Sequence, residues 1–183
     1  MLHEQPNMFH PKPIKLPATY FQRNALEVAP DLLDKLLVRR YDDGRIERFR
    51  IVEVEAYCGE EDKACHASKG RTKRTEVMYH SGGKLYVYLI YGMYYMLNIV
   101  TGCEGEPQAV LIRGVEGVTG PGRLTKRLHI SGDFNGEEIP SDRIWMEEDT
   151  TDKPHYITTP RIGIDYAGEW KDKPWRFVLS KTF

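Results

Sequence analysis

Five segments of the chain are rich in apolar, β-branched and aromatic residues and are bounded by turn-forming residues, which predicts a β-sheet. They are residues 48–57, 85–90, 95–100, 109–113 and 175–180. Helical spacing of apolar residues occurs at residues 24–37, where Pro30 and Asp31 suit a helix start, and again after Gly120-Pro121-Gly122. The pattern therefore predicts more strands than helices.

Short turns are expected to join several of these strands. Asp42-Asp43-Gly44 is a hairpin signal before residues 48–57, and Tyr91-Gly92-Met93-Tyr94 forms a tight turn between residues 85–90 and 95–100. Hairpin connections favour antiparallel neighbours, and 183 residues suffice for one core. The predicted class is α+β: a single compact domain with a curved, largely antiparallel sheet flanked by a few helices.

The remaining segments are expected to carry little regular structure. Residues 1–17 contain four prolines and no apolar run, so we predict a flexible arm followed by a folded domain at residues 18–183. Residues 64–80 are polar and glycine-punctuated, which predicts a loop. Residues 132–160 are polar and acidic, which predicts irregular surface.

The charge of the chain is segregated although its net value is only −1. Residues 63–74 hold five basic side chains and no acid, whereas residues 137–152 hold seven acids and one base. A domain of this kind can present a basic face to phosphates and an acidic face to solvent. The alternative is a pair of solvated loops of opposite sign.

Cysteine use and hydropathy exclude several classes of protein. Three cysteines without a signal peptide argue against a disulfide framework and for a reducing, cytoplasmic compartment. Cys58, Cys65, His66 and Cys103 lack the spacing of a structural zinc site, so no metal and no cofactor are predicted. The longest apolar stretch, residues 85–100, is too short and too interrupted to span a bilayer.

Glu55 is the first candidate for chemistry. In a regular strand it shares a face with Ile51 and Tyr57, and a carboxylate directed at a core is costly unless it is paired or functional. A carboxylate beside flat aromatic rings is also what a pocket for an extruded nucleobase requires, since the rings hold the base and the carboxylate accepts a proton from water. The alternative is a solvated glutamate on the outer face.

The second candidate is the tyrosine-rich hairpin tip at residues 91–94. Turns run over protein surfaces, and exposed aromatic side chains there can contact a partner such as a DNA base stack. The alternative is that these rings fold back over the core.

Several motifs, taken together and in order, resemble the alkyladenine (3-methyladenine) DNA glycosylase family. They are IVEVEAY at 51–57, Asp62, ACH at 64–66, LYVYLIYGMY at 85–94 with Asn98, VLIR at 110–113, GPGRL at 120–124, and RIGI at 161–164 followed by AGEW at 167–170. The chain departs from this family at Arg74-Thr75, where Arg-Asn is usual.

The resemblance implies catalytic and base-binding roles. Glu55 would be the general base that activates water for attack on C1′ of the deoxyribose, and Arg113 would help to hold that water. Tyr57 and His66 would stack on the two faces of the base, Tyr88 would lie against its edge, and Asn98 would obstruct the amino group of normal guanine.

The resemblance also implies contacts with DNA. Tyr91 would enter the minor groove in place of the extruded nucleotide, with Met93 and Tyr94 beside it. The segregated charge, rather than the resemblance, gives the residues expected near phosphates: Lys69, Arg71, Lys73, Arg74, Arg123 and Arg127.

The predicted function is therefore a monofunctional glycosylase that removes alkylated or deaminated purines from double-stranded DNA, acting as a monomer without a cofactor. The substrate class would include 3-methyladenine, 7-methylguanine, hypoxanthine and ethenoadenine. The alternative from another class is a non-catalytic nucleic-acid binder that uses the hairpin and the basic loop as a stacking platform. Glu55 argues against it, because a carboxylate repels phosphate.

Overall fold

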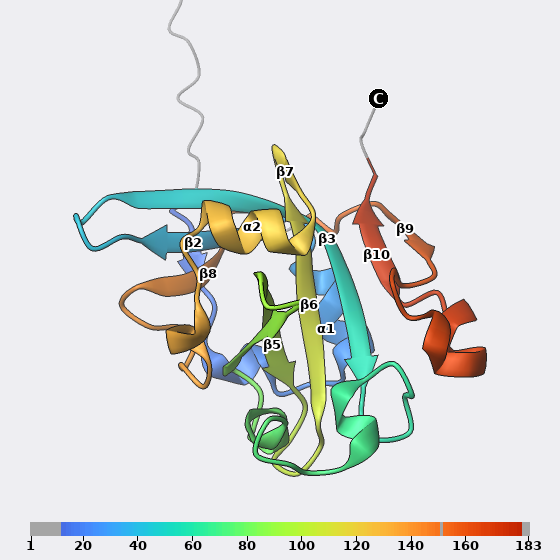
Figure 1. The fold of residues 1–183 in the computed structure, drawn as a ribbon. Helices are drawn as coiled ribbons and strands as arrows, with labels where there is room; N and C mark the ends of the chain where they lie inside the picture. Colours follow the sequence, from blue (N-terminus) through green and yellow to red (C-terminus); the bar gives the residue numbers. More distant parts are fainter. Residues whose placement is uncertain (1–11, 151, 181–183) are drawn as a thin grey trace, which may run out of the picture.

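The computed structural model describes residues 12–150 and 152–180 (Figure 1). Within these residues the chain forms ten strands, all paired antiparallel, with two α-helices and short 3₁₀ turns. The strands are β1 Ile14–Lys15, β2 Leu36–Arg40, β3 Ile46–Cys58, β4 Leu85–Ile90, β5 Tyr94–Thr101, β6 Gln108–Val115, β7 Val118–Thr119, β8 Ile144–Glu148, β9 Tyr156–Thr159 and β10 Arg176–Leu179. The α-helices are α1 Ala25–Leu32 and α2 Pro121–Arg127. The predicted α+β class, with a single domain and an antiparallel sheet, is confirmed.

Strand β3 is the longest strand and organises the sheet (Figure 1). Its first half pairs with β2, and its second half lies between β6 and β10. The order along the sheet is β1-β8-β2-β3-β6-β5-β4, with β10 and β9 extending from β3 and β7 from β6. The second half of β3 thereby contributes to the same surface as β4, β5 and β6.

Helix α1 packs against β3 and β6 and supports the centre of the sheet. Asn24 caps its first turn by accepting a hydrogen bond from the backbone N–H of Leu26. The prediction that Pro30 and Asp31 start this helix is wrong, because Pro30 lies inside it and the chain enters β2 at Leu36. A short run of leucines fits a helix and a buried strand equally well, so spacing alone did not separate them.

The acidic segment 132–160 contains two strands, and the expectation of irregular surface is wrong there. Ile144, Trp145 and Met146 of β8 are buried, and β8 pairs with β2. Its acidic residue Glu147 is buried, where it accepts hydrogen bonds from the indole of Trp145 and from Arg48. Because acids in this segment are paired inside the fold, its acidic composition did not indicate a buried strand.

Two other segments have more structure than the sequence pattern indicates. The loop predicted at residues 64–80 includes the 3₁₀ turns η2 His66–Lys69 and η3 Glu76–Tyr79. Of the predicted arm, residues 1–11 lie outside the described residues, whereas β1 pairs with β8 and Leu16 is buried. The described end of that arm is therefore attached to the sheet.

Among the described residues, neither length nor apolar character would allow any helix to span a membrane.

Candidate active site

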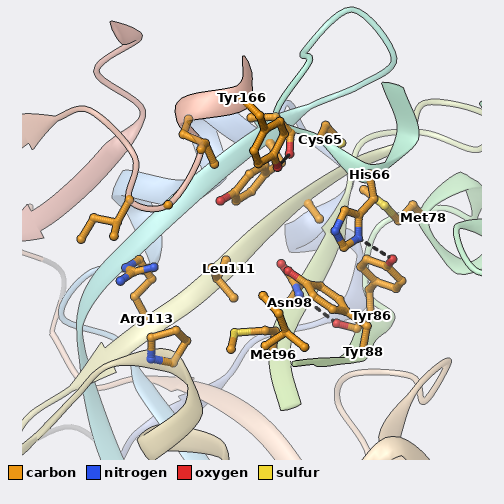
Figure 2. Close-up of a pocket in the computed structure, with 18 of the residues that line it drawn as sticks. Cys65, His66, Met78, Tyr86, Tyr88, Met96, Asn98, Leu111, Arg113 and Tyr166 are labelled. Atoms are coloured by element: carbon orange, nitrogen blue, oxygen red, sulfur yellow. Dashed lines mark hydrogen bonds between the residues drawn. The ribbon is translucent and has the colours of Figure 1, made fainter. Parts of the chain in front are cut away.

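A cavity of about 240 Å³ opens on the face of the sheet formed by β3, β4, β5 and β6 (Figure 2). Alternate residues of a strand point to the same face, so side chains spaced by two line the cavity together. From these strands they are Tyr57, Tyr86, Tyr88, Ile90, Met96, Asn98, Ala109, Leu111 and Arg113. The rest of the wall comes from residues 64–66, residues 162–164, Met78, Pro121 and Tyr166, and Tyr91 lies at the hairpin end.

Strand register assembles the site from distant parts of the chain. Tyr86 is paired with Asn98, Asn98 with Leu111, and Leu111 with Glu55. One row across four strands thus connects the aromatic end of the cavity to Glu55. The amide of Asn98 is buried and donates a hydrogen bond to the backbone carbonyl of Tyr86 at 3.1 Å (Figure 2).

The aromatic end of the cavity is built around His66. Its Nδ1 lies 2.9 Å from the hydroxyl of Tyr86, and its ring centroid lies 4.5 Å from that of Tyr88 (Figure 2). Burial lowers the pKa of His66 to about 4, with smaller contributions in the same direction from Arg74 and Lys69. The imidazole is therefore uncharged at neutral pH and presents a neutral aromatic surface.

Glu55 is fully buried at the edge of the cavity rather than in its lining. Its Oε2 accepts a 2.7 Å hydrogen bond from the hydroxyl of Tyr57, and its Oε1 accepts a 2.8 Å hydrogen bond from the backbone N–H of Ile162. Nε of Arg113 lies 3.6 Å from Oε1. Tyr57, Arg113 and Ile162 all line the cavity. The alternative of a solvated glutamate is thus wrong. The carboxylate lies directly behind the residues that form the cavity wall.

The environment of Glu55 raises the pKa of its carboxyl group. Burial is the main cause, and it is opposed by the charge of Arg113 and by the hydrogen bonds from Ile162 and Tyr57. A raised pKa makes the carboxylate a stronger base than an exposed glutamate.

A buried ion pair holds the backbone of residue 162 against Glu55. Arg161 and Asp62 contact each other at 2.6 Å with both side chains fully buried. Arg161 also donates to the carbonyl of Ala56 in β3, and Asp62 accepts from the backbone N–H groups of Cys58 and Ala64. This arrangement anchors the segment after β9 to the end of β3.

Four residues near the site were not predicted from the sequence: Ile162, Glu53, Arg176 and Tyr166. Ile162 acts through its backbone N–H, which leaves no signal in side-chain chemistry. Glu53 had a signal, since it shares a strand face with Glu55, and its Oε1 accepts from Nε of both Arg113 and Arg176. Tyr166 is 70% exposed, lines the cavity and donates a hydrogen bond to the carbonyl of Ala64.

The hairpin tip projects from the mouth of the cavity. Tyr91 is 83% exposed, Met93 67% and Tyr94 44%, so the alternative of rings folded over the core does not hold. Tyr91 has a positive φ of 52°, a conformation that is uncommon for a bulky residue. A Cβ on Gly122 would lie 2.8 Å from the ring of Tyr94, so the start of α2 needs glycine at this close approach.

The six basic residues expected near phosphates fall into two groups. Arg71 pairs with Glu76, and Arg127 pairs with Glu47. The others are exposed and have no ion-pair partner within the described part of the chain: Lys69, Lys73, Arg74 and Arg123. Lys69 and Arg74 border a second hollow of about 250 Å³ that shares His66 and Tyr166 with the main cavity.

The loop that carries these basic residues is closed by Thr75. Its Oγ1 accepts from the backbone N–H of Thr72 and donates to the carbonyl of Gly70. The threonine thereby supplies hydrogen bonds inside the loop at the position where the chain departs from the Arg-Asn pair.

Two of the three cysteines, Cys58 and Cys65, have the character of thiols rather than thiolates, whereas Cys103 is exposed. Burial raises the pKa of Cys58 to about 12 and that of Cys65 to about 11. Across residues 12–150 and 152–180, no three His, Cys, Asp or Glu side chains cluster in a way that would hold a metal ion.

The chain is similar over most of its length to proteins of one family. Residues 19–182 match the family described as Methylpurine-DNA glycosylase (MPG). Proteins named "Putative 3-methyladenine DNA glycosylase" are similar over most of their length. The one from Methanocella arvoryzae is 45% identical, covering 88% of this chain and 90% of the relative. The one from Legionella pneumophila (strain Lens) is 46% identical, covering 91% and 94%. The one from Natranaerobius thermophilus is 41% identical, covering 91% and 96%. The chain therefore belongs to the methylpurine-DNA glycosylase family and is a DNA glycosylase, a hydrolase of N-glycosyl bonds.

Proposed function

We propose that this glycosylase rotates a damaged purine nucleotide out of duplex DNA into the cavity and hydrolyses its glycosidic bond with a water activated by Glu55. The observation that carries the proposal is the contact of Glu55 with Tyr57, Arg113 and the backbone of Ile162, all of which line the cavity. The carboxylate is thus adjacent to the aromatic rings that line the cavity. Membership of an enzyme family argues against the alternative of a non-catalytic binder.

The cavity favours a flat and electron-poor base. Tyr57, His66 and Tyr88 present aromatic surfaces, and the low pKa of His66 keeps its ring uncharged. A base alkylated at N3 or N7 carries a positive charge, which aromatic faces attract. Stacking of a base on each ring is expected to contribute about 1–3 kcal/mol. The proposed substrate class is therefore alkylated purines, with deaminated and etheno-bridged purines as candidates.

The proposed reaction needs one proton acceptor. The water oxygen forms a bond to C1′, the C1′–N bond breaks, and its electron pair leaves with the base, which cancels the positive charge of an alkylated purine. A neutral purine such as hypoxanthine leaves as an anion and takes up a proton from solvent. One proton of the water passes to the carboxylate of Glu55, and Arg113 orients the water. The reaction involves no covalent enzyme intermediate and leaves the DNA strand intact.

DNA would be held by the hairpin tip and by the basic loop. Tyr91, with Met93 and Tyr94 beside it, would fill the space left by the extruded nucleotide, which is a recognised use of exposed aromatic and apolar side chains. The basic side chains without an ion-pair partner in the described residues would contact phosphates. They are Lys69, Lys73, Arg74 and Arg123. Asn98, fixed by its bond to the carbonyl of Tyr86, would exclude normal guanine.

The test is the release of base from methylated duplex DNA by Glu55→Gln under single-turnover conditions. Loss of the proton acceptor is expected to slow release about 10²–10⁴-fold, while binding to the same DNA stays within a few-fold. Glu61→Gln is the matched control, since Glu61 is an exposed acid near the end of β3. Release by Glu55→Gln at the rate of the control would refute the mechanism.

A further inference from the structure

Glu53 has an unusual position beside the proposed catalytic carboxylate. It precedes Glu55 by two residues on β3, both carboxylates approach Nε of Arg113, and only 6% of Glu53 is exposed. Its Oε1 lies 2.9 Å from Nε of Arg113 and 2.6 Å from Nε of Arg176. One buried carboxylate oxygen therefore accepts charge-assisted hydrogen bonds from two guanidinium groups.

Glu53 and Glu55 compete for Arg113. Nε of Arg113 is within hydrogen-bond distance of Glu53, but its 3.6 Å separation from Oε1 of Glu55 is too long for a hydrogen bond. If Glu53 were absent, the carboxylate of Glu55 would be the nearest negative charge left to Arg113. A direct pair would engage the carboxylate that has to accept a proton and would reduce its basicity.

The backbone also keeps Arg113 in this intermediate position. The register of β3 against β6 shifts on both sides of Glu53, and Arg113 has no paired residue on β3. Bulges of this kind redirect side chains and recur near active sites. The terminal nitrogens of Arg113 donate to none of the residues that the structure describes, although Arg113 lines the cavity. They are free to meet water or deoxyribose.

We propose that Glu53 is a positioning residue for hydrolysis: it holds Nε of Arg113, so that Arg113 does not form a direct hydrogen bond with Glu55 and the terminal nitrogens of Arg113 face the reacting water. The proposal rests on the proposed role of Glu55. It assigns no contact between Glu53 and substrate.

A purely structural role is the competing explanation. Arg176 lies on β10 opposite Glu55, and its guanidinium also donates to Thr159 of β9. On this view Glu53 only fastens β10 to β3, and removal of Arg176 would have the same consequences as removal of Glu53.

The experiment compares pH–rate profiles for base release from methylated duplex DNA in single-turnover conditions. The variants are Glu53→Gln, Arg113→Met, their double mutant, and Arg176→Met as the control for the tether. Glu53→Gln is expected to lower the plateau rate about 10–100-fold, the scale of a misplaced catalytic group. Its acidic limb is expected to move to lower pH, because Arg113 then approaches Glu55 more closely and lowers the pKa of Glu55 further.

The double mutant decides whether Glu53 acts through Arg113. Once Arg113 is replaced, Glu53→Gln is expected to change the plateau rate by no more than about 2-fold and to leave the acidic limb of the pH–rate profile in place. The effects of the two substitutions are then not additive. Additive losses, or a profile for Arg176→Met that matches Glu53→Gln, would overturn the proposal. If Glu53→Gln does not fold, Glu53→Asp, which keeps the charge but shortens the reach, is measured in the same cycle.

The outcomes also separate this proposal from the proposed mechanism. Full activity of Glu55→Gln would remove the mechanism and with it the role of Glu53. An inactive Glu55→Gln together with a folded and fully active Glu53→Gln would leave the mechanism standing and refute the positioning role alone.

Discussion

The hydroxyl of Tyr57 donates a 2.7 Å hydrogen bond to Oε2 of Glu55, so one side chain connects the cavity to the buried carboxylate. The two residues are spaced by two on β3 and therefore share a face of the strand. The ring of Tyr57 lines the cavity, and burial together with the neighbouring carboxylate raises the pKa of its hydroxyl well above the ordinary value. The hydroxyl thus stays protonated and remains a donor to Glu55.

This hydrogen bond predicts a pH effect for Tyr57→Phe. The substitution keeps the ring but removes a donor that lowers the pKa of Glu55. The carboxylate then protonates more readily, and the acidic limb of the pH–rate profile is expected to move to higher pH. Base release from methylated DNA, measured between pH 4.5 and 9 in single turnovers, gives the limb directly.

Tyr88→Phe is the control for this experiment, because it removes a hydroxyl from another ring of the same cavity that is not bonded to Glu55. The acidic limb of the pH–rate profile of Tyr88→Phe should stay in place. If the acidic limb of the pH–rate profile of Tyr57→Phe coincides with that of the wild type, the tyrosine serves only as a stacking surface.

Glu55→Gln is expected to stabilise the protein at neutral pH while abolishing activity. The folded-state pKa of Glu55 is raised, so the group is neutral in both states at low pH and becomes costly to the folded state as pH rises through that pKa. Glutamine removes the buried charge, and its amide can still accept from Ile162. If the gain is about 1 kcal/mol, Tm rises by about 2–4 °C at pH 7. Thermal unfolding at pH 7 and pH 4 checks this, and a gain at pH 4 as large as that at pH 7 would contradict it.

The fold was predictable where strands are short, apolar and joined by tight turns. β4, β5 and the intervening tip follow from alternation and turn residues, and the sheet face of Tyr88 and Asn98 follows from the same period. β8 was not predictable in this way, because the neutralisation of Glu147 by Arg48 depends on a tertiary contact.

Prediction of the site was limited for a similar reason. Glu55 and Tyr57 were predicted, because aromatic and acidic residues two apart are visible in a sequence, whereas Glu53 on the same strand was missed. The partners that set its chemistry come from residues 113 and 162, and only register and the Arg161–Asp62 pair bring these to it. The register shift that isolates Arg113 has no sequence signal of its own.

Binding to DNA is expected to depend strongly on salt despite the net charge of −1. Four basic side chains have no ion-pair partner in the described residues: Lys69, Lys73, Arg74 and Arg123. If each neutralises one phosphate, a plot of the logarithm of the binding constant against the logarithm of the salt concentration has a slope of about −4. Arg74→Gln should make this slope less steep by about 1, whereas Arg127→Gln should leave it unchanged, since Arg127 is paired with Glu47. Titration of a fluorescent duplex at several salt concentrations measures both. Equal slopes for the two variants would place the DNA on another face.

Asn98→Ser is expected to relax discrimination against normal guanine. Normal and damaged purines differ little in shape, so the cavity needs a fixed obstacle rather than a size limit. Asn98 is only 3% exposed, lies between Tyr86 and Leu111 in the row across the sheet, and is held by its bond to the Tyr86 carbonyl. A buried side chain held by this hydrogen bond does not move aside for the C2 amino group that guanine has and hypoxanthine lacks. Serine is shorter and lifts the obstacle, so guanine release should rise while hypoxanthine release changes less. Single-turnover rates for the two bases in one duplex context give the ratio, and Met96→Leu, a change of similar volume at another lining residue of β5, should not alter it. If Asn98→Ser lowers Tm but leaves the ratio unchanged, Asn98 packs the hairpin and selectivity arises elsewhere.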